Sequence, residues 1–264
     1  MTGTPVMIDL KNQSVAQIKK SIDALPFEQY DLWISALSAD TRKGVRALAE
    51  KLVKRQAERE KLIHALNVKK QVENDLRAKG FRFICGIDEV GRGPLAGPVV
   101  AGAVILPEDF SVLGIDDSKK LSHAKRAKLA EAIKGEAISY AVSEVSPAVI
   151  DDINILEATK LAMSKAVESL AVTPDFLLID ALSIPSAVPV KPVVHGDALC
   201  LSIGAASIIA KEHRDDLMRE YDAVYPGYGL ASYMGYGSAK HIEAIKTLGP
   251  TPIHRKSFIQ NFVR

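Results

Sequence analysis

The character of the sequence changes at Gly80, and this change constrains the possible fold more than any other feature. From residue 41 to residue 79 no proline occurs, and leucines and valines recur at roughly helical spacing. After Gly80, short apolar runs alternate with amphipathic segments, a pattern typical of an α/β domain with a mixed sheet. We therefore predict an all-α N-terminal extension at residues 1–79. An α/β domain, its mixed sheet flanked by helices, should occupy residues 80–264.

The apolar runs predict the strands, and the amphipathic segments between them predict the helices. The predicted strands are residues 81–88, 98–106, 137–145, 175–180 and 188–194. The predicted helices of the same region are residues 123–134, 154–170, 202–224 and 238–247. In the extension, Ser14 and Asp40 are predicted helix N-caps, and Pro26 is a predicted helix stop.

The composition of the chain excludes several classes of protein. Of its 264 residues, 47% are hydrophobic and 25% are charged, which is ordinary for a globular protein. No run approaches the roughly 18 unbroken apolar residues of a membrane span, and the N-terminus lacks a secretory signal pattern. Cys85 and Cys200 are the only cysteines, too few for a disulfide framework or a cysteine-based zinc site. We expect a cytoplasmic protein that does not associate with membranes.

The predicted extension carries a strong local charge. Residues 41–79 contain twelve lysines and arginines against five acids, a net charge of +7, whereas the whole chain carries only +2. A basic helical arm on a slightly acidic body favours contact with a nucleic-acid backbone. A solvated helix face is the alternative, because most runs of charge bind no ligand. The sequence leaves both interpretations open.

Four carboxylates lie at or just beyond the ends of predicted strands: Asp88, Glu89, Asp180 and Asp197. Carboxylates in such places can converge at one edge of a sheet, where the sites of α/β proteins tend to lie. Converging acids repel one another, so they favour hard divalent cations such as Mg²⁺ or Mn²⁺. Two such ions about 4 Å apart are suited to phosphodiester hydrolysis. Taken singly, each aspartate has the ordinary alternative of a turn or cap residue.

The geometry of Glu89 depends on the loop that follows it. Neighbouring strand residues point to opposite faces, so Asp88 and Glu89 enter one site only if the strand breaks there. Gly91 and Gly93 favour such a break; without it, Glu89 would act through its carbonyl or through a bound water. The same glycines flank Arg92, and backbone N–H groups in a loop of this kind can bind anions. A tight connection between two strands is the alternative interpretation of the loop.

Seven segments of the chain resemble bacterial ribonuclease HII, a type 2 ribonuclease H, in order and at family-like spacing. They are GIDEVGRGPLAGPVVAGAVIL (86–106), DDSKKLS (116–122), LLIDA (177–181), HGDALCLSIGAASIIAKEHRD (195–215), YPGYG (225–229), GYGSAKH (235–241) and TPIHRKSF (251–258). The resemblance covers roughly residues 80–260 and implies a ribonuclease H-like fold. Arg92 favours this type over the sister type, ribonuclease HIII.

The resemblance also implies an activity. It implies an endonuclease that hydrolyses the phosphodiester 5′ to ribonucleotides, in RNA/DNA hybrids and at single ribonucleotides embedded in duplex DNA. A two-metal-ion mechanism with Mn²⁺ or Mg²⁺ would leave 3′-hydroxyl and 5′-phosphate ends, as ribonucleotide excision repair requires. We expect a monomer; a sliding-clamp partner is conceivable, but nothing in the sequence supports it. The alternatives are a structure-specific DNA nuclease and a non-catalytic nucleic-acid-binding protein.

Site roles follow from the resemblance position by position. The residues that match the four metal-site and catalytic acids are Asp88, Glu89, Asp180 and Asp197. The residues that match substrate-binding positions are Gly91, Arg92 and Gly93 for the ribose 2′-hydroxyl, Tyr236 for the neighbouring sugar, and Lys119 for a phosphate. Without the resemblance, Tyr236 would be interpreted as a core or turn residue and Lys119 as a solvated lysine.

Some positions depart from the commonest family pattern. His195 stands where lysine often precedes Gly-Asp, and Tyr233-Met234 stand where many members have His-Lys. Losing these cations could weaken phosphate contacts, for which the basic arm could compensate. We expect His195 and His254 to be structural or substrate-contact residues rather than proton-transfer groups. Lys211 and Arg214 are expected to be surface or scaffold charges.

Overall fold

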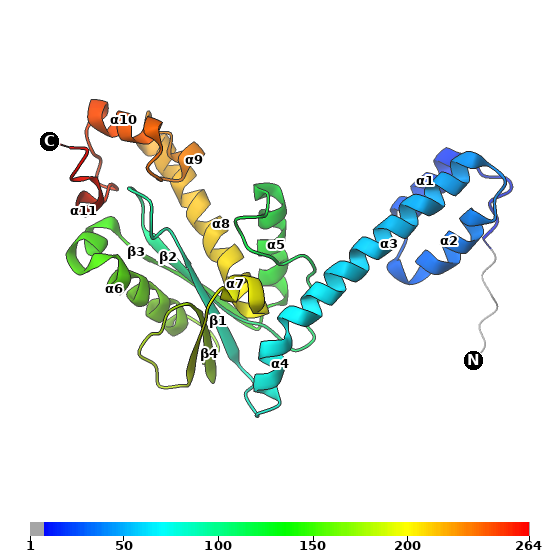
Figure 1. Cartoon of the computed structure of the whole chain (residues 1–264), viewed down its shortest axis with the longest axis horizontal. Helices are drawn as coiled ribbons and strands as arrows, with labels where there is room; N and C mark the ends of the chain where they lie inside the picture. Colours follow the sequence, from blue (N-terminus) through cyan, green and yellow to red (C-terminus); the bar gives the residue numbers. More distant parts are fainter. Residues whose placement is uncertain (1–7, 264) are drawn as a thin grey trace. The chain divides into compact units, whose positions relative to one another are not determined.

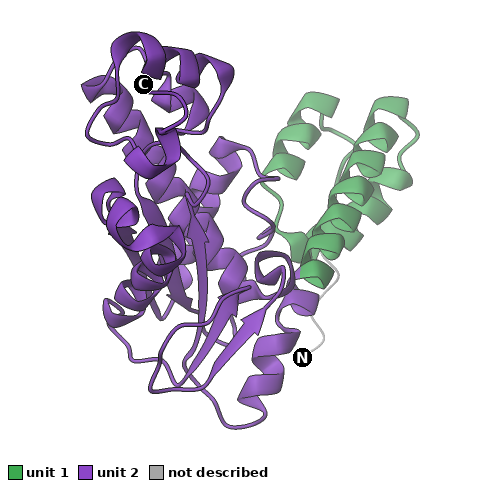
Figure 2. Ribbon diagram, turned by 60° about the vertical axis from the view of Figure 1, so that its left-hand side comes forward, with its two compact units in different colours: residues 1–65 green, residues 66–264 purple. Residues whose placement is uncertain are grey.

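The computed structural model describes residues 8–263, and the chain divides into two compact units, residues 1–65 and residues 66–264 (Figure 2). Within residues 8–65 the first unit contains helices and no strand, and the second contains a five-stranded sheet with helices. Each unit has its own hydrophobic core. The mixed α/β class and the helical N-terminal region predicted from the sequence are confirmed. The compact units divide after residue 65, whereas the predicted extension ends at residue 79, and that domain boundary stays a prediction. No helix within residues 8–263 is long and apolar enough to cross a membrane.

The first unit begins with a capped helix. Helix α1 (Val15–Asp23) starts after Ser14, whose Oγ accepts a hydrogen bond from the Gln17 amide at 3.3 Å. The Gln17 side chain in turn accepts from the Ser14 amide at 2.8 Å, which completes a capping box. The predicted N-cap is therefore confirmed. Pro26 separates α1 from the 3₁₀ turn η1 (Phe27–Gln29) and helix α2 (Tyr30–Ser38).

The long helical stretch that follows starts later than predicted and is divided in two. Helix α3 spans Lys43–Lys69, and helix α4 spans Gln71–Arg77. Asp40 is not its N-cap, because the Asp40 carboxylate accepts from the Arg42 amide at 2.8 Å and pairs with the Arg42 guanidinium ahead of the helix. After α4, Gly80 adopts a φ of +98°, a conformation that favours glycine and ends the helical region.

The second unit is built on a sheet in the strand order β3-β2-β1-β4-β5 (Figure 1). Its strands are β1 (Ile84–Val90), β2 (Val99–Ile105), β3 (Ser139–Val145), β4 (Phe176–Asp180) and β5 (Val190–Val193). The β1–β2 and β2–β3 pairs are antiparallel, whereas β1–β4 and β4–β5 are parallel. The carboxyl ends of β1, β4 and β5 therefore lie at one edge of the sheet. All five predicted strands form, and no bound differs from the prediction by more than three residues.

Two long helices cover the two faces of the sheet. Helix α6 (Pro147–Glu168) packs against the face that carries Cys85 and Ile87. Helix α8 (Leu201–Val224) lies on the other face, against Ile84 and Gly86. A Cβ on Gly86 would lie 2.1 Å from the Ser202 carbonyl carbon, so only glycine permits this close approach of strand and helix.

The remaining helices complete the second unit. They are α5 (His123–Glu136), α7 (Gly196–Leu199), α9 (Leu230–Tyr233), α10 (Ala239–Leu248) and α11 (Lys256–Ile259). Helices α5 and α10 match their predicted ranges within two residues. The four-residue helices α7, α9 and α11 have no counterpart in the prediction, since single turns carry no periodic signal. Helix α6 extends seven residues before its predicted start, and Asn154 interrupts it with a φ of +68°.

Candidate active site

Asp88 and Asp180 lie at the same edge of the sheet. Strands β1 and β4 are parallel neighbours, and Ile87 pairs with Ile179, so the next residue of each strand is an aspartate at the same level. Strand β5 ends at Val193, and His195 then turns the chain with a φ of +57° into α7, which carries Asp197. The Gly196 amide donates to Asp180 Oδ1 at 2.7 Å, which ties α7 to the end of β4. The fold thus brings three of the four predicted acids to one edge.

Glu89 is placed differently from the sequence-based expectation. The predicted break does not occur there, because β1 continues in register with β2 through Val90, and the positive φ angle first appears at Gly91. Asp88 and Glu89 therefore belong to opposite faces of the strand. Glu89 Oε1 lies 3.4 Å from Arg92 Nη1, and Glu89 Oε2 is buried without a hydrogen-bond partner.

The acids perturb one another electrostatically. Burial raises the pKa of Asp88 well above its ordinary value, and the charges of Glu89 and Asp180 add to this effect. Burial also raises the pKa of Glu89, although Arg92 opposes the shift. The pKa of Asp180 is raised by burial and by the charge of Asp197. Clustered carboxylates that resist ionisation in this way are stabilised by a nearby cation.

The donor set fits a hard divalent cation in chemistry and charge. All four predicted ligands are carboxylates, and Glu89 Oε2 is a buried acceptor without a hydrogen-bond partner. Within residues 8–263 no three His, Cys, Asp or Glu side chains are already gathered closely enough to hold an ion. Because β1 is unbroken at Glu89, this residue would act on the metal through its carbonyl or through a bound water.

Lys119 lies on a loop that a buried network fixes to α8. Burial raises the pKa values of Glu89 and Asp180, and the charge of Lys119 opposes the rise in both. The Ser118 hydroxyl lies 3.0 Å from the Ser207 hydroxyl, and the Ser118 carbonyl accepts from Arg126 at 3.2 Å. Ser207 also opposes the rise in the Asp88 pKa through hydrogen bonding. No sequence signal distinguishes Ser207 or Arg126 from other residues of their types.

Two fully buried arginines hold the Gly91–Pro98 loop. Arg255 donates to the carbonyl oxygens of Gly91 at 2.5 Å, Arg92 at 2.8 Å and Gly97 at 3.0 Å. Burial and the nearby Arg214 guanidinium lower the pKa of Arg255 to about 9, so it still carries its charge at neutral pH.

Arg214 holds the other end of the same loop and joins it to a second loop. It donates to the carbonyl oxygens of Ala96, Pro98 and Met234 at 2.9 to 3.1 Å. The scaffold role expected for Arg214 is thus supported by its contacts. The importance of Arg255 was missed, because IHRKSF looks like an ordinary charged segment.

Tyr236 lies beside the glycine loop and is 45% exposed, so its ring is available to a ligand. A Cβ on Gly93 would lie 3.8 Å from Tyr236 Cε1. The Gly235 carbonyl accepts from the Leu95 amide at 2.8 Å, which fastens the Tyr236 loop to the chain after the glycines. The fold therefore gathers the predicted substrate-binding residues of the two loops.

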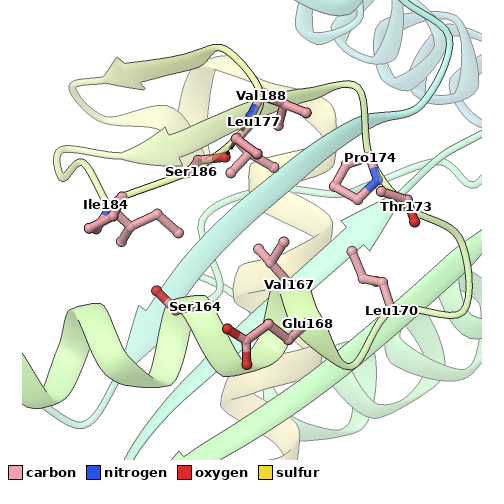
Figure 3. Close-up of a pocket in the computed structure, with 12 residues that line it drawn as sticks. Ser164, Val167, Glu168, Leu170, Thr173, Pro174, Leu177, Ile184, Ser186 and Val188 are labelled. Carbon is pink, nitrogen blue, oxygen red and sulfur yellow. Dashed lines mark hydrogen bonds between the residues drawn. The ribbon is translucent and has the colours of Figure 1, made fainter.

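The structure also contains an apolar pocket of about 520 Å³ (Figure 3). It is formed by the end of α6, the start of β4 and the segment 184–188, with Val167, Leu177 and Ile184 in its wall. None of the predicted site residues lines it. The candidate active site is instead the open sheet edge that bears the acids.

Four arginines of the basic arm make contacts within the first unit. Arg42 donates to the carbonyls of Leu10 and Gln13, and Arg46 to those of Asp40 and Thr41. The guanidinium groups of Arg55 and Arg59 lie over the rings of Tyr30 and Phe27, 5.5 and 4.7 Å from the centroids. These cations stabilise the unit itself. The lysines of α3 are better placed to contact phosphates; among them Lys51, Lys54 and Lys61 are exposed.

Comparison with solved structures defines the class of protein first. The ribonuclease H2 of Pyrococcus horikoshii OT3 superimposes with a TM-score of 0.57 and 27% identity, over 68% of this chain and 96% of that chain. The sheet and its helices thus have the fold of a ribonuclease H, a hydrolase and nuclease.

The family follows from sequence comparison. The family model for Ribonuclease HII matches residues 85–261, and that for the Ribonuclease HII N-terminal domain matches residues 14–77. Ribonuclease HII of Clostridioides difficile (strain 630) is 48% identical over 258 residues, 96% of this chain and 100% of the relative. Ribonuclease HII of Bacillus mycoides (strain KBAB4) is 52% identical over 226 residues, 84% and 86% of the two chains. The chain belongs to the ribonuclease HII family and is an endoribonuclease that acts on RNA/DNA.

Proposed function

We propose that this ribonuclease hydrolyses the phosphodiester 5′ to a ribonucleotide, both in RNA/DNA hybrids and at single ribonucleotides in duplex DNA. The observation that carries the proposal is the placement of the Gly91–Gly93 loop. It follows β1 directly after Asp88 and Glu89, and Tyr236 flanks it. A residue that senses the sugar would then sit beside the acids that act on the adjoining phosphate.

The acids would hold divalent ions, Mn²⁺ or Mg²⁺, and two ions per site in the substrate complex match the reaction. When bound, such ions supply a nucleophile from water and stabilise the leaving oxygen. Asp88 is the central ligand of the proposal, because it is buried and level with Asp180. Asp197 completes the edge from α7. Lys119 offsets the negative charge of this cluster and would contact a phosphate of the substrate.

Selectivity for RNA is assigned to the loop rather than to the acids. A 2′-hydroxyl both donates and accepts hydrogen bonds, so backbone groups can separate it from the 2′-hydrogen of DNA. Arg255 binds the carbonyls of Gly91 and Arg92 and so holds the loop, whose N–H groups would contact the 2′-hydroxyl. The exposed Tyr236 ring offers a surface for packing against the neighbouring sugar.

The N-terminal unit is proposed to bind the duplex backbone. Replacing Lys51, Lys54 and Lys61 by glutamine in the full chain should raise KM and leave kcat unchanged. The slope of log KM against log salt should fall by about 0.9 for each phosphate that the variant no longer neutralises. An unchanged slope would show that these lysines of α3 are solvated and contact no phosphate.

Product mapping tests the proposed reaction. A duplex with one ribonucleotide should yield an upstream strand ending in a 3′-hydroxyl and a downstream strand whose 5′-phosphate is on the ribonucleotide. Cleavage on the 3′ side of the ribonucleotide, or a 2′,3′-cyclic phosphate end, would contradict a water-mediated reaction at this site. The Asp88→Asn variant serves as the inactive control.

A further inference from the structure

A buried pair of histidines lies behind Tyr236 and is not used by the chemistry proposed above. His241, in the first turn of α10, and His254 are 0% and 3% exposed, and their Nε2 atoms lie 3.1 Å apart. Tyr228 is the other titratable side chain that faces them, with its ring centroid 6.4 Å and 5.1 Å from the two imidazoles. Arg255, next in the chain, directs its guanidinium away to the glycine loop.

The backbone partners fix which nitrogen of each ring carries the proton. His241 Nδ1 faces the Tyr236 carbonyl oxygen at 2.9 Å, and a carbonyl only accepts, so this nitrogen must be protonated. His254 Nδ1 accepts from the Thr251 amide at 2.9 Å and so must be bare. A neutral His254 then carries its proton on Nε2 and donates it to the bare Nε2 of His241.

The chain of hydrogen bonds therefore has one direction, from the Thr251 amide through both imidazoles to the Tyr236 carbonyl. It is complete only when both rings are uncharged. Protonating His241 would oppose two N–H groups across the 3.1 Å contact, and protonating His254 would oppose the Thr251 amide. Burial lowers the pKa values of both imidazoles, in agreement with this geometry.

We propose that His241 and His254 are positioning residues for Tyr236, and that they set the enzyme's preference for a ribonucleotide joined to DNA. Segment 251–255 links the two loops. Its His254 donates to His241, which donates to the Tyr236 carbonyl, and its Arg255 donates to the carbonyls of Gly91 and Arg92. The two loops that contact the sugar are thus spaced by a single short segment.

The inference rests on the proposed function, because it takes Tyr236 as the sugar contact. A double-mutant cycle in the full-length enzyme tests it, using a duplex with one ribonucleotide as substrate. We expect His241→Ala and Tyr236→Ala each to lower kcat/KM at least tenfold. The double variant should be no worse than Tyr236→Ala, because a residue that acts only through Tyr236 has no effect once the ring is gone. If the fold-losses in kcat/KM of the two single variants multiply in the double variant, the inference is overturned.

A conservative variant separates positioning from general packing. In His241→Asn the side-chain amide can still donate to the Tyr236 carbonyl from the position of Nδ1 but no longer contacts His254, so kcat/KM should lie between those of His241→Ala and wild type. If His241→Ala does not fold, His241→Asn replaces it in the cycle with Tyr236→Ala: a double variant no worse than Tyr236→Ala supports the inference, and losses that multiply overturn it. Nitrogen chemical shifts of the wild type should show Nδ1–H on His241 and Nε2–H on His254; the reverse assignment would also overturn it.

The wild-type enzyme distinguishes the two levels of the proposal. Equal cleavage of the single-ribonucleotide duplex and its all-DNA counterpart would contradict both the proposed function and the inference that rests on it. A retained preference for the ribonucleotide combined with multiplying effects in the cycle would remove the inference alone.

Discussion

The Arg255 guanidinium lies 2.5 Å from the carbonyl oxygen of Gly91, the residue at which the chain leaves β1 after the paired acids. The same guanidinium binds the carbonyls of Arg92 and Gly97, and the side chain is fully buried. A single side chain of the C-terminal segment therefore shapes a loop more than 150 residues earlier in the sequence.

Arg255→Met should destabilise the enzyme and disorder the glycine loop, because three buried carbonyl groups lose their donor. We expect a loss of about 3 kcal/mol in the free energy of unfolding. Denaturant titration measures this loss. Lys256→Met is the matched control, since it removes a neighbouring cation that is exposed, and it should change the stability by less than about 0.5 kcal/mol.

Gly91→Ala should cost much more than Gly80→Ala, although both glycines have φ angles above +90°. A Cβ at Gly91 would lie 2.2 Å from Arg214 Nε, whereas a Cβ at Gly80 meets nothing within 4 Å. Backbone strain alone costs about 1–2 kcal/mol, and the clash should raise the cost at Gly91 to on the order of 4 kcal/mol. Equal thermal shifts in the two variants would show that the Arg214 contact does not constrain the loop.

Asp88→Asn should abolish activity without destabilising the metal-free protein. Asparagine is nearly isosteric, and it removes a buried charge that Glu89 and Asp180 already repel. Cleavage should fall on the order of 10²-fold or more, and the rise in Tm that Mn²⁺ gives to the wild type should disappear. A cleavage assay measures the loss of activity. Calorimetry with and without Mn²⁺ measures the stability of the metal-free variant and the change in Tm that the metal gives. Near-wild-type cleavage in saturating metal would show that the assigned site is wrong.

Stability should depend on pH through the histidine pair, and the sign follows from the lowered pKa. The pKa of His254 is lowered to about 4, so between pH 6.5 and about 4 the unfolded chain binds a proton that the folded chain excludes. Stability is therefore lost as the pH falls through this window, by up to about 1.4 kcal/mol per pH unit for His254. The pKa of His241 is also lowered by burial, so His241 acts in the same direction.

The acids of the active site act in the opposite direction. Their raised pKa values favour the folded state as the pH falls, so the wild-type curve alone is not diagnostic. The difference between wild type and the double variant His241→Asn/His254→Asn isolates the histidines. Wild type should lose more stability than the variant between pH 6.5 and 4, and parallel curves would contradict the assignment.

Sequence reasoning located the strands and the acids because both depend on local pattern. The apolar run that ends at Asp180 and the run before Asp88 form strands because each run is short and apolar. The two strands are parallel neighbours, so their carboxyl ends lie together. The strand break expected at Glu89 does not occur, which leaves the alternative that Glu89 acts through its carbonyl or through a bound water. Glycines after a strand favour a break, but pairing with β2 continues until Gly91 because Val90 still finds a partner in Val100.

The supporting residues could not be predicted, since their contacts span most of the chain. Arg255 and Gly91 are 164 positions apart, and Ser118 and Ser207 are 89 apart. Nothing local separates a buried arginine from a solvated one. The break between α3 and α4 is equally hidden, because no proline or glycine marks it. Only the packed structure assigns these roles.

The proposed function depends on recognition of a 2′-hydroxyl next to the phosphate that the enzyme cleaves. Two duplexes of identical sequence, one with a single ribonucleotide and one entirely DNA, are incubated with the full-length enzyme and Mn²⁺ or Mg²⁺. We expect a single cut on the 5′ side of the ribonucleotide and no cut at that position in the DNA duplex. Equal cleavage of the two duplexes would show that the 2′-hydroxyl is not recognised.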